Sequence, residues 1–453
     1  MMENRKERRE NVLNVKRFFS ASVENSDSDK PSEPLCLLPE ELEILVRNLQ
    51  RICSRQSAIV SLRRFVTDEI RVTALCHVES SMRSIVSILI NGTSDVQVEA
   101  AWCLTNIAAG SHKHTKSVLK AAGAYLVTFL ESFDQRLQDP CAWAVGNIAS
   151  DCKSFRQVLF AQGAVHALIL LLDFRSQSVG HSALFALANI TLDVKDDVMS
   201  AAVTSGIVLK VVQLSRVEKM ELGMLTELTR LMMHICSWNN RSFRESVASH
   251  ELISSVVNLL EHLIVDMQLY IAPITWIVRA IANFLESGPC IEDEHVASLL
   301  PSLLSSGHDF LTKELLWCLA NLTASHPSML SEHKILPIVV SLLSCKATDV
   351  RREAGIVIMN AVCQVPGFDV FAVDLGILHP MIELLKSTEI HLLKLGIQFF
   401  DVIMASCIDH DIPILRPVML SVVKDIKSLC DHPKPQIQRW TQELIKMYKL
   451  DET

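Results

Sequence analysis

An aromatic residue followed four positions later by asparagine recurs along the chain. Two clear copies are Trp102 with Asn106 and Trp143 with Asn147. Residues four apart on a helix lie on the same face, one above the other. An asparagine amide can bind both the N–H and the C=O of a peptide backbone, and an aromatic face attracts the cationic head of lysine or arginine. The pattern therefore predicts a helical surface that binds an extended, basic peptide.

The number of residues between successive copies of this aromatic/asparagine pair indicates which kind of helical repeat contains it. Phe185 with Asn189 forms a third copy, and the first three asparagines are 41 and 42 residues apart. A period of about 40 residues is that of armadillo or HEAT repeats. Between the copies, a glycine precedes an apolar run, at Gly123, Gly163, Gly206 and Gly376. Because glycine permits a sharp corner, we expect a short first helix, a corner, a second helix and a third helix that carries the pair.

The second half of the chain carries less regular copies. Asn283, Asn321 and Asn360 continue the series at intervals of 38 and 39 residues, and we place the missing copy at Arg230–Cys236, with His234 at the asparagine position. We therefore predict an all-α fold, an armadillo-repeat right-handed superhelical solenoid of about nine to ten three-helix repeats. Residues 38–453 would form this domain, with the third helices along its concave side.

Composition supports a helical binding protein and excludes other classes. Of the 453 residues, 49% are hydrophobic and 21% charged, which suits a chain with much buried surface, and the net charge of −8 opposes general nucleic-acid binding. No apolar run reaches the roughly 18 residues that a membrane span needs, so we do not expect a membrane protein. A protein that binds basic partners is the expectation that remains.

The sequence also lacks the usual marks of catalysis and metal binding. The 13 cysteines include no C-x-x-C pair, and we interpret them as reduced core residues of a cytosolic or nuclear protein. There is no glycine-rich phosphate loop or nucleophile elbow, and Ser111–His114 is interpreted as a polar loop. We predict no enzyme activity, no cofactor and no metal site.

The N-terminus differs from the rest of the chain. Residues 1–23 are basic, with Arg5–Arg9 and Lys16–Arg17, and residues 24–37 are rich in Ser, Asp and Pro. Such a composition is typical of a flexible, acidic linker. A solvated tail and a tail that folds back onto an acidic surface both remain open.

Glu99–Ala108 and Trp143–Asp151 resemble the Trp/Asn motifs of the importin-α family, armadillo-repeat adaptors for nuclear import. The resemblance implies a receptor for lysine- and arginine-rich nuclear-localisation signals on cargo proteins, located in cytoplasm and nucleus. In its major site, Gly110, Thr115 and Asp151 would form a lysine-selective pocket. The other major-site residues would be Trp102, Asn106, Trp143, Asn147, Phe185 and Asn189.

The resemblance weakens towards both ends of the chain. A minor peptide site would comprise Arg279, Asn283, Trp317, Asn321, Glu353 and Asn360. Ile356 replaces a second Trp of this site, and Phe284–Pro289 departs from the family's turn. Residues 5–17 resemble the latter half of the importin-β-binding segment, without its upstream arginine cluster, so importin-β is an implied partner. The alternative is a non-transport armadillo scaffold that binds another extended or helical segment.

Overall fold

The computed structural model describes residues 37–450 apart from short internal stretches. The stretches left out are 174–175, 194–195, 217–218, 239, 241–242, 244–250, 286–292, 326–329, 331–334, 365–375, 411–415 and 449. The expected basic tail at 1–23 and all but the last residue of the expected linker at 24–37 lie outside the described residues. The same holds for most of the turn at Phe284–Pro289.

The described residues are helical and include no β-strand, which confirms the predicted all-α class. The chain divides into two compact units, Met1–Asn240 and Arg241–Thr453. The predicted major-site residues all belong to the first unit, and the predicted minor-site residues all belong to the second. Each set is therefore positioned by the helices of its own unit.

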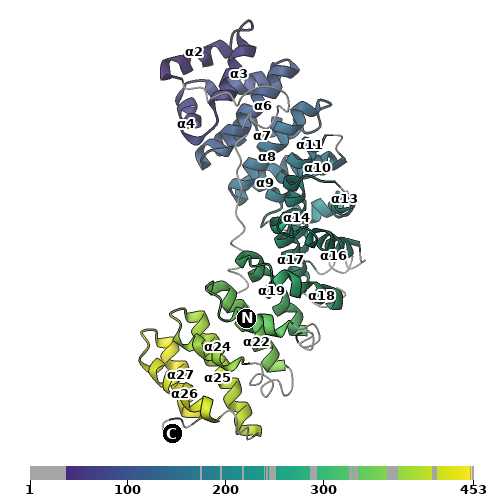
Figure 1. The fold of residues 1–453 in the computed structure, drawn as a ribbon. Helices are drawn as coiled ribbons and strands as arrows, with labels where there is room; N and C mark the ends of the chain where they lie inside the picture. The colour runs from purple at the N-terminus through teal and green to yellow at the C-terminus, as the bar shows by residue number, and fades with distance from the viewer. Residues whose placement is uncertain are drawn as a thin grey trace. The chain divides into compact units, whose positions relative to one another are not determined.

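The first unit is built from successive helical repeats (Figure 1). It begins with α2 (Pro39–Leu49) and α3 (Arg55–Phe65), followed by α4 (Glu69–His77), α5 (Ser81–Asn91) and α6 (Ser94–Ala109). It continues with α7 (His112–Phe129), α8 (Gln135–Asp151), α9 (Lys153–Ala161), α10 (Ala164–Leu170), η2 (Leu171–Asp173), α11 (Gln177–Ile190), α12 (Asp196–Thr204), α13 (Ile207–Ser215) and α14 (Leu222–Cys236). The aromatic/asparagine pairs lie on α6, α8 and α11, the third helices of their repeats.

The glycine corners follow the prediction at three of four positions. Gly163, Gly206 and Gly376 have φ of 88°, 87° and 70°, a region that favours glycine because it has no Cβ. Gly123 was predicted wrongly, since it lies inside α7, which continues unbroken from His112 to Phe129. This repeat therefore has one long helix where its neighbours have two short ones.

The second unit repeats the same plan. Its helices are α16 (Glu251–Ile264), α17 (Ile271–Leu285), α18 (Asp293–Leu304), α19 (Asp309–Ser325), α21 (Leu336–Leu342), α22 (Thr348–Gln364), α24 (Leu378–Glu383), η3 (Leu384–Lys386), α25 (Ile390–His410), α26 (Arg416–Ser428), η5 (Leu429–Asp431) and α27 (Pro435–Met447). The pairs of this half lie on α17, α19 and α22, which pack against one another in order.

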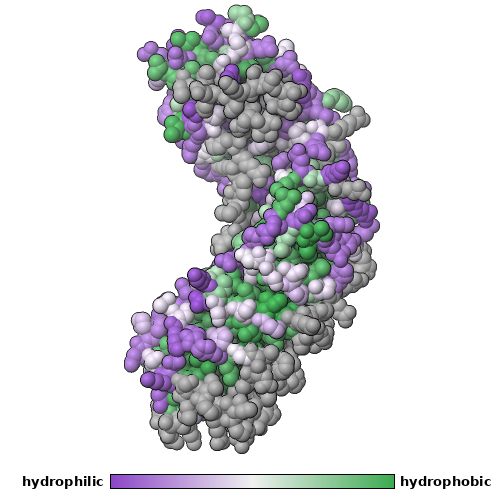
Figure 2. All heavy atoms as spheres, viewed as in Figure 1, coloured by the Kyte–Doolittle hydropathy of each residue, from purple (hydrophilic) through white to green (hydrophobic). Residues whose placement is uncertain are grey.

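The third helices form the core of the first unit. From Ala100 to Ala109 every residue of α6 is buried, because this helix contacts α3, α5, α7 and α8. The exposed large apolar side chains are dispersed and include Ile52, Phe133 and Val265. On the face drawn in Figure 2, hydrophilic and hydrophobic side chains are likewise intermingled.

Among the described residues, no single helix is both long and apolar enough to cross a bilayer. Two bent pairs, α9 with α10–η2 and α12 with α13, pass the same test of length and composition only when each pair is taken together.

Candidate peptide-binding surface

The aromatic members of the first three pairs form a continuous row across α6, α8 and α11. The ring centroids of Trp102 and Trp143 are 5.7 Å apart at 70°, and those of Trp143 and Phe185 are 6.2 Å apart at 59°. Such edge-to-face contacts are favourable because the positive edge of one ring meets the negative face of the next. Trp143 is half-buried, whereas Trp102 and Phe185 are 4% and 2% exposed. Trp143 is therefore the most accessible ring of the row.

Gly146 sets the distance between α8 and α11. A Cβ at this position would lie 2.6 Å from two ring carbons of Phe185, much closer than real Cβ contacts. Glycine therefore lets the Phe185 ring lie directly on the backbone of α8. This close approach brings the third member into the aromatic row.

The asparagines tie each repeat to the one before it. Asn147 donates its Nδ2 hydrogen to the carbonyl of Thr105 at 3.1 Å, and Asn189 donates to the carbonyl of Gly146 at 3.0 Å. In both cases the acceptor is the residue that precedes the asparagine of the preceding repeat. We call this regular series of bonds the amide ladder. Sequence reasoning gave these amides a ligand-binding role only and missed the bond between repeats.

The ladder also shows where the irregular copy fits. In α14, His234 lies at the predicted asparagine position, and its Nδ1 is 3.1 Å from the hydroxyl of Thr191. Thr191 comes two residues after Asn189, and its hydroxyl donates to the carbonyl of Leu187 at 2.7 Å. A histidine thus reaches the preceding repeat through a hydroxyl, in agreement with the predicted register.

The predicted lysine pocket lies at the turns that follow α6 and α8. The carboxylate of Asp151, at the end of α8, bonds the Nδ1 atom of His112, the first residue of α7. The Asp151 side chain is only 4% exposed, whereas the His112 side chain is 61% exposed. His112 lies between Gly110 and Thr115 in sequence, and this contact brings the carboxylate to the start of α7.

Local capping explains the shape of this turn. Gly110 ends α6, and a Cβ there would lie 2.8 Å from Nδ1 of His114. Ser111 then caps α7, and its hydroxyl is 3.0 Å from the same nitrogen. The buried Thr115 hydroxyl donates to the carbonyls of Ala108 at 2.9 Å and of Ser111 at 3.1 Å. These two bonds tie the end of α6 to the first turn of α7.

The amide ladder continues in the second unit. Asn321 donates to the carbonyl of Ala282 at 2.8 Å, and Asn360 donates to that of Ala320 at 2.9 Å, again one residue before the preceding asparagine. Asn283, which is 7% exposed, lies one helix earlier on α17.

Two charged residues of the predicted minor site, Arg279 and Glu353, already have partners of opposite charge in the same unit. The Nη1 atom of Arg279 lies 3.8 Å from Oε1 of Glu314. Glu314 is on α19, three residues before Trp317. Glu353 is fully buried and accepts a hydrogen bond from Nε of Arg352 at 3.3 Å. A basic ligand would have to compete with these arginines.

Comparison with known proteins identifies the chain's relatives. Importin subunit alpha-9 of Arabidopsis thaliana is 26% identical over 450 residues, which cover 88% of this chain and 83% of the relative. Importin subunit alpha-2 of Oryza sativa subsp. japonica is 28% identical over 441 residues, with 88% and 82% covered. In the solved structures, an engineered protein matches the fold with a TM-score of 0.75 at 24% identity, over 90% of this chain and 99% of its own. No protein-family model matches the sequence.

The chain is similar to importin-α subunits and has an armadillo-repeat fold. The likeness to the importin subunits extends along nearly the whole chain and is not confined to the two best repeats. The importin-α-like chain nevertheless has features that motif reasoning did not reveal. In α14, Arg230 occupies the aromatic position and is paired at 2.5 Å with Glu227, whose side chain is 1% exposed. In the sequence, a glutamate three residues before an arginine on a predicted helix was the signal that could have indicated this ion pair.

Two further features near the site bear on its chemistry. Arg63 of α3 donates to Glu99 at 2.5 Å, which anchors the start of the first full motif to the preceding repeat.

Burial raises the pKa of the Cys103 thiol in α6, with a smaller contribution from Glu99, and burial likewise raises the pKa of the Cys141 thiol. These two thiols therefore stay protonated and act as small core side chains, as the sequence predicted.

Proposed function

We propose that this importin-α-like protein is a nuclear import signal receptor. It would bind lysine- and arginine-rich nuclear-localisation peptides, in extended conformation, along the aromatic row and amide ladder of the first unit. The observation that carries the proposal is the alignment of Trp102, Trp143 and Phe185 in one row, with Asp151 at the end of the helix that carries Trp143.

The chemistry of the row suits a basic ligand. The aliphatic stem of a lysine or arginine can lie over aromatic rings while its charged head is attracted by a ring face. An asparagine amide is a group that can bind both the N–H and the C=O of a peptide backbone. The side chains of Asn106, Asn147 and Asn189 would then fix the direction of the peptide.

The pocket of Gly110, Thr115 and Asp151 would select lysine at one peptide position. A carboxylate, a hydroxyl oxygen and a backbone carbonyl are acceptors that together match the three donors of an ammonium. His112 is bonded to the carboxylate, so a lysine must displace this imidazole or share Asp151 with it. The His112 side chain is 61% exposed, so a displaced imidazole would be hydrated.

The remaining parts of the proposal follow from the importin-α resemblance. The protein would move between cytoplasm and nucleus with its cargo, and residues 5–17 would bind importin-β. In the second unit, Arg279, Asn283, Trp317, Asn321, Glu353 and Asn360 would form a weaker peptide site, since Arg279 and Arg352 compete for the carboxylates. No step of this function requires catalysis.

The test is a fluorescence-anisotropy titration with a labelled lysine-rich signal peptide. Asp151→Asn keeps the size of the side chain but removes its charge, and we expect a loss of about 2 kcal/mol, which is roughly 30-fold in Kd. Glu131→Gln is the matched control, because this exposed residue follows α7 at the opposite end of α8 and undergoes the same charge change. Equal affinities for the native protein and Asp151→Asn would refute the lysine pocket.

The second candidate is an armadillo scaffold for a segment that is not lysine-rich. The pairing of Asp151 with His112 favours it, because this carboxylate already has a partner. The same titration separates the candidates if each lysine of the peptide is replaced in turn. A receptor of the proposed kind has one lysine whose replacement matters in the native protein but not in Asp151→Asn.

A further inference from the structure

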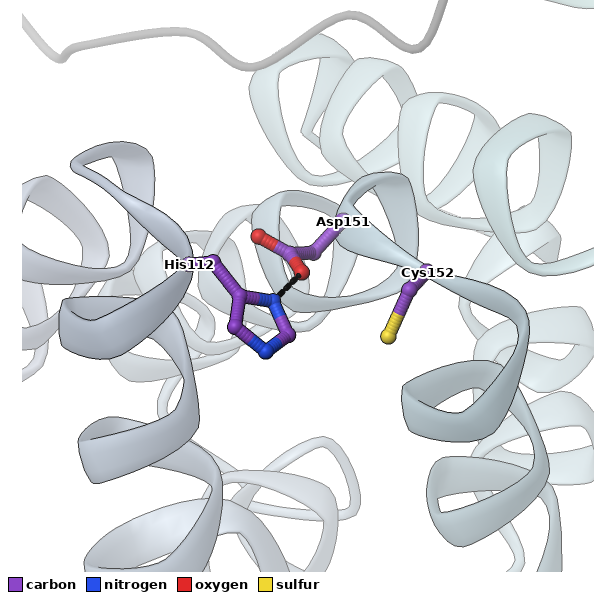
Figure 3. A group of neighbouring side chains, drawn as sticks. All are labelled: His112, Asp151 and Cys152. Carbon is purple, nitrogen blue, oxygen red and sulfur yellow. Dashed lines mark hydrogen bonds and ion pairs between the residues drawn. The ribbon is translucent and has the colours of Figure 1, made fainter.

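Three side chains with different metal-binding atoms meet between the turns that follow α6 and α8. One ligand atom from each of His112, Asp151 and Cys152 lies within 4.8 Å of the other two (Figure 3). His112 comes from the start of α7, Asp151 from the end of α8, and Cys152 from the link to α9. Among the described residues, this is the one such group of histidine, cysteine and acidic side chains.

The geometry points to a Zn²⁺ site, and we propose that these three residues bind this ion. Imidazole nitrogen, carboxylate oxygen and thiolate sulfur are the ligands that zinc takes in proteins, in a tetrahedral arrangement. Zinc–ligand bonds of about 2.0–2.3 Å place neighbouring ligand atoms roughly 3.2–3.8 Å apart. The widest separation, at most 4.8 Å, therefore needs to shorten by about 1 Å, whereas the hydrogen-bonded atoms of His112 and Asp151 need to move apart. Side-chain rotation of His112 and Cys152 can supply both changes.

The surroundings hold the three side chains ready for an ion. The His112 ring stacks on Phe155 of α9, with centroids 5.0 Å apart and planes at 10°, and this contact fixes the ring with its Nδ1 towards Asp151. Cys152 has extended backbone angles (φ −156°, ψ 162°) because it both ends α8 and precedes α9. Its sulfur lies 3.1 Å from the hydroxyl of Ser154, which can hydrogen-bond a coordinated thiolate.

The site would bind the ion with three protein ligands and one open position. Binding converts the Cys152 thiol to a thiolate and releases its proton to solvent. The exposed His112 ring gives the ion access, whereas the Asp151 side chain is almost fully buried. The open position would hold a water molecule or an anionic group of a ligand.

Zinc would then control the lysine pocket, and this consequence rests on the proposed function. Asp151 cannot serve as ligand to Zn²⁺ and as partner of a lysine ammonium without placing two cations side by side, which is unfavourable. Zinc and the lysine of a bound peptide should therefore compete. The amide ladder and aromatic row lie outside this competition.

Metal binding is tested with Co²⁺, which takes the place of Zn²⁺ and has a thiolate charge-transfer band. The full chain is treated with chelator and titrated with Co²⁺, and we expect one equivalent to produce this band at micromolar concentration. Cys152→Ser should remove the band, whereas Cys53→Ser, a change at an exposed cysteine of the same unit, should keep it. His112→Ala is the second variant, because its side chain is largely exposed and folding should tolerate the change.

Two results would overturn the metal site. One is a band of unchanged intensity in both Cys152→Ser and His112→Ala, and the other is an absence of binding at micromolar Co²⁺ to the folded native chain. Circular dichroism of each variant in chelator establishes that it is folded before the titration. If one variant is unfolded, the other decides the outcome.

The competition is measured with a labelled lysine-rich peptide that contains no histidine or cysteine. With Zn²⁺ at ten times its own Kd, the apparent Kd of the peptide should rise about 11-fold for the native chain and stay unchanged for Cys152→Ser. An unchanged Kd for the native chain would refute the competition. Failure of the peptide to bind even in chelator would refute the proposed receptor function, while the Co²⁺ titration would still report on the metal site.

Discussion

The amide ladder predicts that Asn147 stabilises the first unit even when no peptide is bound. Its Nδ2 donates to the backbone carbonyl of Thr105, and both residues are 0% exposed. Asn147→Ala removes this bond, about 1 kcal/mol, and leaves the Thr105 carbonyl with one partner fewer in a buried place, which costs about 1–2 kcal/mol more. We therefore expect a local loss of roughly 2–3 kcal/mol.

Hydrogen exchange read by mass spectrometry is the assay, because it reports the stability of each helix separately. A loss of 2–3 kcal/mol corresponds to a fall in amide protection of about 30- to 150-fold in α6 and α8. Protection of α2, two repeats away from α8, should stay the same. Asn91→Ala is the matched control, since Asn91 is exposed at the end of α5 and its replacement should change protection very little.

The outcome separates two roles of the amide. If Asn147 serves only a ligand, Asn147→Ala would weaken peptide binding and leave protection in α6 and α8 at the level of Asn91→Ala. That result would refute the structural reasoning. A fall in protection without bound peptide would establish the bond between repeats as part of the fold.

Three further predictions concern helix packing, capping and the aromatic row. Gly146→Ala should lower the free energy of unfolding by about 1–3 kcal/mol, because the clash with Phe185 outweighs the gain of about 1 kcal/mol in helix propensity; an increase in the urea midpoint would contradict it. Asp134 caps α8, and a hydrogen bond from Arg136 is the chief cause that lowers its pKa to about 2. The stabilisation by the Asp134 carboxylate is thus fully present above the ordinary pKa of the group and is lost as the pH falls through about 2. Asp134→Ala should therefore lower the free energy of unfolding by about 1 kcal/mol at pH 7 and by little at pH 2. Equal urea midpoints of variant and native protein at pH 7 would contradict this prediction. Trp143→Ala should weaken binding of a basic peptide by about 1–2 kcal/mol in the anisotropy titration, and unchanged affinity would contradict a role of this half-buried ring in binding.

The sequence predicted the repeat architecture because apolar periodicity and the recurring pairs are local signals. The positive φ at Gly163, Gly206 and Gly376 follows from the same kind of signal. Gly123 did not follow it, because alanines flank it and favour continuation of the helix. A Cβ at Gly123 would lie 2.9 Å from Cδ1 of Leu119, so packing along α7 accounts for this glycine.

The candidate site was less predictable because its contacts join residues about 40 positions apart. The types of Asn147 and Asp151 were apparent from the motif, but their partners Thr105 and His112 were not. His112 was assigned to a polar loop, and only the placement of the α6–α7 turn beside the α8–α9 turn brings it to Asp151. The same applies to the contact between the Trp102 and Trp143 rings, which depends on the distance between neighbouring third helices.

The amide ladder makes the spacing of the repeats independent of the length of their loops. Donor and acceptor are 42 and 43 residues apart in the first unit and 39 and 40 in the second, yet the bond lengths remain between 2.8 and 3.1 Å. Insertions and deletions on the outer loops can therefore accumulate while successive third helices keep one repeat distance. A peptide that matches this period in one repeat would match it in the next. The amide ladder would therefore set how many residues of a bound peptide lie along each repeat.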